Sequence, residues 1–271
     1  MAMSGLETLA YALGVTVALM GVIFVLSRIL LRFGVLPLAA AFSLSGFNVL
    51  LLYLLIFPGT VIHELSHYLA CLLTGVRVRQ VRLFSPQKNG AMGWVMSDPA
   101  DPLRRSVIAL APFVGGSLAI YALVRFGLPS GQIDPLTIAP NDVAQGFSTA
   151  FTSIVNALRT ADLHQVTTVL VLYVLFSLGF AVAPSNEDLA PLATYGLLAV
   201  GLVLVVRVVD THYALGLARS ALLNNTAIFL TGVFQRLNAL LLFACAVVGL
   251  GTLLIVPVAM VAYWLRSGLK S

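Results

Sequence analysis

Long apolar stretches separated by short polar breaks run through almost the whole chain. Residues 6–31 are nearly all apolar, and at ~1.5 Å per residue they are long enough to cross a bilayer of ~30 Å. Similar stretches predict spanning helices at residues 103–126, 164–183, 189–206 and 237–265. The segment 211–236 is mixed in polarity and is expected to lie at the membrane interface. Together with residues 35–75, this pattern predicts an all-α polytopic membrane protein with about six or seven transmembrane helices.

Residues 35–75 are apolar almost throughout, and Pro37, Gly46 and the pair Pro58-Gly59 are the main interruptions. The segment is either two spans, or a re-entrant piece followed by one long helix kinked at Pro58, because proline removes a helical hydrogen bond. Both readings stay open at this point. The pattern is helical within residues 57–75, and Gly75 is predicted to end the helix as a C-terminal cap.

The pattern then changes to an alternation of apolar and polar positions over residues 76–84, which is typical of a strand. Residues 85–90 carry turn chemistry, and residues 91–97 are suited to a return strand. Residues 76–98 are therefore predicted to form a β-hairpin. Because unpaired strand edges cannot face lipid, we expect the hairpin at the interface or inside a cavity lined by protein.

Composition supports a membrane protein, since 60% of the 271 residues are hydrophobic and only 9% are charged, against about 25% charged in soluble domains. The net charge of +5 is small and no basic cluster carries interleaved aromatics, so we expect the lipid bilayer and no nucleic acid as a partner. Cys71 and Cys245 lie in apolar runs and predict no disulfide. The first apolar segment is too long for a signal peptide and is expected to be retained. Residues 1–271 are predicted to form a single membrane-embedded domain.

The distribution of positive charge predicts an orientation. The densest basic stretch lies around the hairpin and comprises Arg77, Arg79, Arg82, Lys88, Arg104 and Arg105. Because basic loops stay in the cytoplasm, the hairpin is expected to face it. We therefore expect a multi-pass protein of the plasma membrane, with its functional site towards the cytoplasmic side.

One motif carries chemistry, the H-E-x-x-H formed by His63, Glu64 and His67. Positions i and i+4 of a helix lie on one face, so the two imidazoles can bind one metal ion. Two histidines and a glutamate in an apolar helix cost free energy at membrane depth, so metal binding explains their presence more readily than chance does. We expect one Zn²⁺ ion, with Glu64 as the catalytic base that takes a proton from metal-bound water and passes it to a leaving amine.

A catalytic zinc site needs a third protein ligand, and carboxylates are scarce in this chain. The candidates after Asp101 are Asp134, Asp142, Asp162, Glu187, Asp188 and Asp210. We favour Asp188, at the end of the span in residues 164–188, and place Glu187 second, because both follow a Pro-Ser break at the end of an apolar span. The alternative role for Asp188 is an ordinary helix cap.

These features together resemble the site-2 proteases, which are intramembrane zinc metalloproteases. The resemblance rests on H-E-x-x-H in an apolar helix, the hairpin after it, and a later span with an aspartate near its cytoplasmic end. Pro184-Ser185-Asn186-Glu187-Asp188 looks like the P-S-x-x-D variant of divergent members, whereas L-D-G or P-D-G is usual. Ala111-Pro112 and Gly115-Gly116 stand where the family has G-P-x-x-N, without the asparagine.

The resemblance implies a zinc endopeptidase that hydrolyses peptide bonds in transmembrane or membrane-proximal segments of a membrane-protein substrate. It implies His63, His67 and Asp188 as metal ligands and Glu64 as the catalytic residue. Two alternatives stay open: an inactive or metal-stabilised scaffold subunit of a larger complex, and a zinc peptidase with a large intramembrane chamber, against which the short loops argue. The sequence does not reveal the substrate or the oligomeric state.

Overall fold

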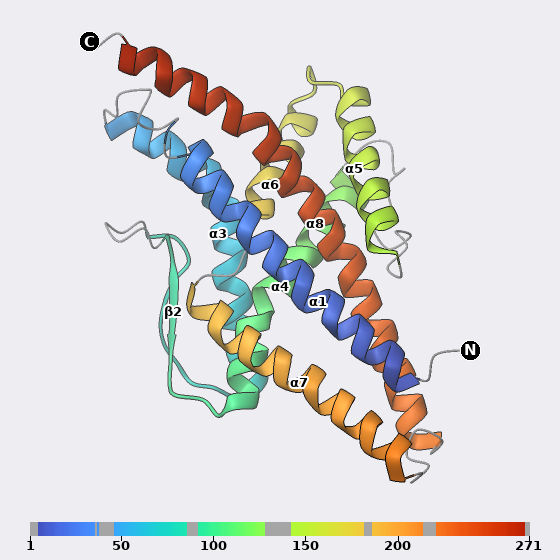
Figure 1. The fold of residues 1–271 in the computed structure, drawn as a ribbon. Coiled ribbons are helices and arrows are strands. Elements are labelled where there is room, and N and C mark those ends of the chain that lie inside the picture. The colour runs from blue at the N-terminus through green and yellow to red at the C-terminus, as the bar shows by residue number, and fades with distance from the viewer. Residues whose placement is uncertain are drawn as a thin grey trace.

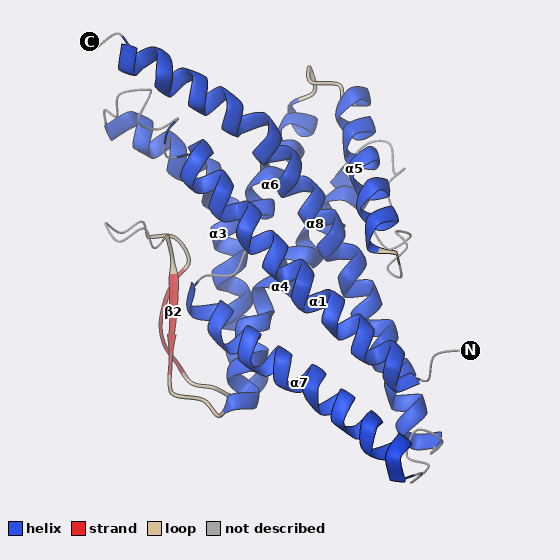
Figure 2. Cartoon of the chain, in the orientation of Figure 1, coloured by secondary structure: helices blue, strands red, loops and turns tan. Residues whose placement is uncertain are grey.

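The computed structural model describes residues 5–35, 37, 46–85, 92–127, 142–181, 186–213 and 221–268. Over these residues the chain is rich in α-helix and carries one small antiparallel sheet of two strands (Figures 1 and 2). Within the described ranges, three helical segments are long and apolar enough to cross a membrane, namely Gly5–Gly34, Pro102–Phe126 and Leu223–Ser267. The architecture is thus compatible with the predicted α-rich membrane protein.

The first and last helices form the long spine of the molecule. Helix α1 (Gly5–Ile29), followed by the π-helical turn η1 (Leu30–Val35), packs along α8 (Ala221–Gly268), as Figure 1 shows. Asn238 is buried between them, with its amide donating to the Ala12 carbonyl at 3.0 Å and its Oδ1 lying 2.6 Å from the Thr16 hydroxyl. In apolar surroundings such polar contacts fix how two helices align.

The last span was predicted to start at residue 237, whereas the helix that contains it, α8, already begins at Ala221. Polar residues such as Asn224 and Arg236 suggested a separate interfacial segment. They do not interrupt the backbone hydrogen bonds of a helix, however, and no proline occurs between Ala221 and Pro257. A change in polarity along a chain is therefore not by itself a helix boundary.

Four further helices pack against this spine and against one another. They are α4 (Pro102–Gly127), α5 (Val143–Thr160), α6 (Val166–Ala181) and α7 (Asn186–Tyr213). The Asp142 carboxylate accepts a hydrogen bond from the Gln145 amide at 2.9 Å and so caps α5, which packs on α8 (Figure 1). Helices α4 and α6 both pack against the remaining helix, α3.

Helix α3 (Gly46–Thr74) carries H-E-x-x-H and continues through Pro58. From Gly46 onwards, the stretch that was open to two readings is therefore one helix, whereas residues 38–45 lie outside the described residues. Proline at position 58 leaves the Leu54 carbonyl without its helical donor, and the Tyr173 hydroxyl of α6 donates to that carbonyl. One turn along α6, the Ser177 Oγ accepts from the Gly59 amide at 2.9 Å. Helix α6 thereby holds α3 at its proline.

The C-terminal end of α3 closes as predicted at Gly75, whose φ of 70° lies in the left-handed region that favours glycine. The Val76 amide donates to the Cys71 carbonyl at 2.8 Å, and the Gly75 amide donates to the Leu72 carbonyl at 3.2 Å. This pair of bonds is a Schellman motif, which satisfies carbonyls at the helix end. The motif turns the chain out of α3 and into the sheet.

The predicted strands after α3 are confirmed, although both are shorter than expected. Strand β1 (Val78–Arg82) pairs antiparallel with β2 (Trp94–Ser97), and Val81 lies opposite Val95. The register shifts between Val78 and Gln80, which accounts for the two consecutive polar residues there. Residues 86–91, which connect the strands, lie outside the described residues.

Candidate metal centre

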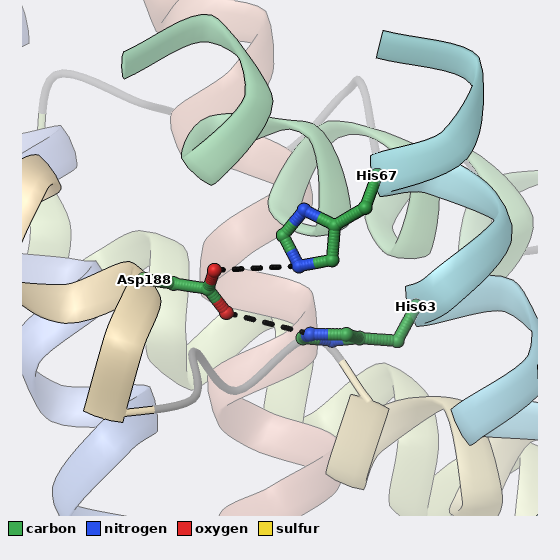
Figure 3. A group of neighbouring side chains, drawn as sticks. All are labelled: His63, His67 and Asp188. Carbon is green, nitrogen blue, oxygen red and sulfur yellow. Dashed lines mark ion pairs between the residues drawn. The ribbon is translucent and has the colours of Figure 1, made fainter. Parts of the chain in front are cut away.

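The two histidines of the motif lie one turn apart on α3 and point the same way (Figure 3). Their rings are arranged edge to face, with centroids 4.9 Å apart and an angle of 77° between the planes. Both side chains are largely buried, at 12% exposure. The i, i+4 spacing in the sequence thus gives the pair of nitrogen donors that it predicts.

Asp188 completes the group from another part of the chain. It lies in the first turn of α7, is 8% exposed, and points between the two imidazoles (Figure 3). Its Oδ2 is 3.5 Å from the His63 Nε2, and its Oδ1 is 3.3 Å from the His67 Nε2. Potential ligand atoms of the three residues all lie within 4.8 Å of one another, so the group could hold a metal ion.

The separations within this group are compatible with ligands that share one ion. A charge-assisted bond between nitrogen and oxygen is usually ~2.7–2.9 Å long, which is shorter than either distance here. Two ligands bound to zinc at ~2.1 Å and at a tetrahedral angle lie ~3.4 Å apart. The 3.3 Å and 3.5 Å separations bracket that value. Two imidazoles and one carboxylate also form a common catalytic donor set for zinc.

The His67 ring is oriented by a backbone group of α4. Its Nδ1 lies 2.9 Å from the Ile108 carbonyl oxygen. A carbonyl can only accept, so Nδ1 carries a hydrogen, and Nε2 is the nitrogen left to bind a metal ion. Nε2 is the atom that faces Asp188, and the arrangement therefore presents a ligand atom to the centre of the group.

Glu64 lies next to His63 on α3 and is 9% exposed. The hairpin approaches it at Gly93, just before β2: a Cβ built on Gly93 would lie 2.7 Å from the Glu64 Cγ. The same Cβ would be 2.8 Å and 2.9 Å from the carbonyl oxygens of Arg82 and Leu83. Only glycine lets the return strand come so close to both the Glu64 side chain and the opposite strand.

Replacing Gly93 with alanine is therefore expected to displace the hairpin from Glu64. Two of the three close atoms belong to the backbone and cannot rotate away, so overpacking of ~1–3 kcal/mol is expected. Thermal unfolding and limited proteolysis of the hairpin measure the effect. The matched control is Gly232→Ala in α8, where a Cβ would meet nothing within 4 Å. Equal behaviour of the two variants would contradict the close approach.

The other predicted candidates for the third ligand lie elsewhere or cannot be placed. Glu187 is in the first turn of α7, but its side chain is outside the described residues, as is the whole of Asp134. Asp142 caps α5, and Asp162 accepts from the His164 amide at 3.0 Å. Asp210 is buried near the far end of α7. Asp188 faces the two histidines, so it does more than cap a helix.

The structural roles of two residues beside this site were not predicted from the sequence. Gly93 occurs in a strand-like stretch, where an isolated glycine signals a close approach of backbone. Pro112 occurs inside an apolar helix, where a proline signals an unpaired carbonyl four residues earlier. The sequence contains both signals. Neither shows that Gly93 approaches Glu64 or that His67 donates to the Ile108 carbonyl.

Compared with known protein families, curated proteins and solved structures, the chain matches none.

Proposed function

We propose that this chain is an intramembrane zinc endopeptidase of the site-2 protease type. The observation that carries the proposal is the buried group of His63, His67 and Asp188, with Glu64 beside it on the same helix. H-E-x-x-H with a third ligand from a distant segment is typical of zinc hydrolases. Helices α3 and α7 both pack against α4, whose segment Pro102–Phe126 is long and apolar enough to cross a membrane, and this supports a site within the membrane.

Each residue then has a distinct role in hydrolysis. A zinc ion held by His63, His67 and Asp188 would activate water and polarise the scissile carbonyl. Glu64 takes the proton of the attacking water and delivers it to the leaving amine. The largely buried positions of all four residues limit competing contact with bulk solvent.

The hairpin gives the proposed substrate a binding mode. Within the described residues the sheet has only β1 and β2, so each strand has an outer edge to which an extended peptide could add. Gly93 brings this hairpin against Glu64, so a peptide on its edge would lie near the base. Helix-breaking residues in a transmembrane substrate would favour the extended form, because a helix hides its amides in its own hydrogen bonds.

The membrane arrangement is part of the proposal. We infer a multi-pass protein of the plasma membrane with about six or seven spans, by counting the shorter apolar helices with the long ones. The basic residues around the hairpin support a cytoplasmic location for that side of the site.

Removal of the metal tests the proposal directly. Purified protein in lipid vesicles should cleave single-span peptides that carry Gly or Pro in the span, and cut all-leucine spans more slowly. A zinc chelator should abolish cleavage, and added zinc should restore it. Mass spectrometry of the fragments measures the cleavage and locates the bond. Cleavage that survives complete removal of zinc would contradict the proposal. Stable co-purification with other membrane proteins, with no cleavage at all, would favour the scaffold alternative.

A further inference from the structure

A proline in α4 lies next to the contact that orients His67. In a regular α-helix the carbonyl of Ile108 accepts a hydrogen bond from the amide of residue 112. Residue 112 is proline, which has no amide hydrogen and whose ring crowds the carbonyl four residues earlier. The Ile108 carbonyl therefore needs a donor from outside its own helix. The donor in the structure is the His67 Nδ1, at 2.9 Å.

Close packing of α4 on α3 brings this carbonyl within reach of the ring. A Cβ built on Gly115 would lie 2.1 Å from the Ser66 Oγ. Ser66 cannot easily make room, because its hydroxyl donates to the Ile62 carbonyl at 2.7 Å. Gly115 thus lets the α4 backbone contact α3 one residue before His67. Phe113, which is fully buried, anchors the same turn of α4.

The same chain uses a helix proline in this way a second time. Pro58 in α3 leaves the Leu54 carbonyl without a helical donor, and the Tyr173 hydroxyl of α6 donates to it. In both places a side chain from a neighbouring helix satisfies the carbonyl four residues before the proline. At Pro58 the donor is not a potential metal ligand, whereas at Pro112 it is.

We propose that Pro112 is a positioning residue for the metal centre: it leaves the Ile108 carbonyl unpaired within α4, and this carbonyl holds His67 in the tautomer with hydrogen on Nδ1. Nε2, which lies 3.3 Å from the Asp188 Oδ1, is then the nitrogen left to bind a metal ion. In metal sites a partner of this kind fixes the ring orientation and raises the basicity of the ligand. The inference rests on the proposed metal site for its purpose, but the hydrogen bond itself can be tested without metal.

The first test reads the tautomer in the metal-free, detergent-solubilised wild-type protein. With ¹⁵N-labelled histidine, NMR distinguishes a protonated ring nitrogen from one with a lone pair. The His67 signal is assigned as the one lost in His67→Gln. For the neutral ring we expect hydrogen on Nδ1. A neutral ring with hydrogen on Nε2 alone would overturn the proposal, and this measurement needs no variant at position 112.

The second test restores the missing amide with Pro112→Ala. The new amide competes for the Ile108 carbonyl, so we expect a mixture of His67 tautomers and ~10–100-fold weaker binding of Zn²⁺ and Co²⁺. The d–d spectrum of bound Co²⁺ should change as well. The matched control is Pro257→Ala, which removes the proline inside α8 at an exposed position. It should leave the tautomer and both affinities as in the wild type.

These readouts separate the positioning role from a purely structural one and from the proposed function. Pro112→Ala that keeps the wild-type tautomer and metal affinity would overturn the proposal, whatever its thermal stability. A wild-type protein that shows the Nδ1-protonated tautomer but takes up neither metal would support the hydrogen bond and overturn the metal site. A protein that binds zinc through an oriented His67 but cleaves no peptide would support this inference and contradict only the protease assignment.

Discussion

Replacing Glu64 with glutamine is expected to abolish peptide cleavage while leaving zinc bound. Glutamine keeps the size and shape of the side chain but cannot accept a proton at neutral pH. Loss of a positioned general base typically slows a reaction ~10²–10⁴-fold. Glu64 is not part of the group formed by His63, His67 and Asp188, so the metal affinity should stay close to that of the wild type.

Two measurements on the same preparations check this expectation. Metal content by elemental analysis reports binding, and cleavage of a co-expressed membrane substrate reports activity. The matched control is Glu7→Gln in the first turn of α1, which makes the same chemical change outside the site. Undiminished cleavage by Glu64→Gln would contradict the role of Glu64 and favour the scaffold alternative.

Replacing Asp188 with alanine is expected to remove the zinc. The substitution deletes the one carboxylate that faces both imidazoles, at 3.3 Å and 3.5 Å. Changes in residues that only support a ligand weaken metal binding ~10–100-fold, so loss of the ligand itself should cost more than ~100-fold. Cleavage should disappear together with the metal.

Zinc affinity measured by competition with a chromophoric chelator tests the assignment. The matched control is Asp210→Ala, because Asp210 is also a buried aspartate of α7 but is not part of the group. Glu187→Ala distinguishes the second choice for the third ligand. Retention of zinc by Asp188→Ala, with loss in Glu187→Ala, would move the ligand to the neighbouring residue and refute our assignment.

Local signals in the sequence predicted much of this structure. The i, i+4 spacing of His63 and His67 predicted their shared face, because helical periodicity alone decides it. Gly75 predicted the end of α3, since a helix-ending residue with positive φ is most easily a glycine. The alternation after Gly75 predicted β1 for the same kind of local reason.

Contacts between distant segments were harder to predict. Asp188 was favoured from its setting beside a Pro-Ser break, but its position between two imidazoles depends on how α7 packs. Pro112 indicates that the Ile108 carbonyl lacks its helical donor, but the sequence does not show that His67 donates to this carbonyl. Likewise, the sequence around Gly93 did not predict that this residue would lie close to the Glu64 side chain. Such contacts depend on how whole helices pack, and a short stretch of sequence does not predict this packing.

The position of the site along α3 bears on how water would reach it. His67 precedes Thr74, the last residue of α3, by seven residues, which is about 10 Å or two turns. His63 follows Gly46 by 17 residues, which is about 26 Å of mostly apolar helix. Each hydrolysed bond consumes one water molecule, and the hairpin end of α3 is the nearer of its two ends. An enzyme built this way would draw its water from one face of the membrane and shield its chemistry from the other.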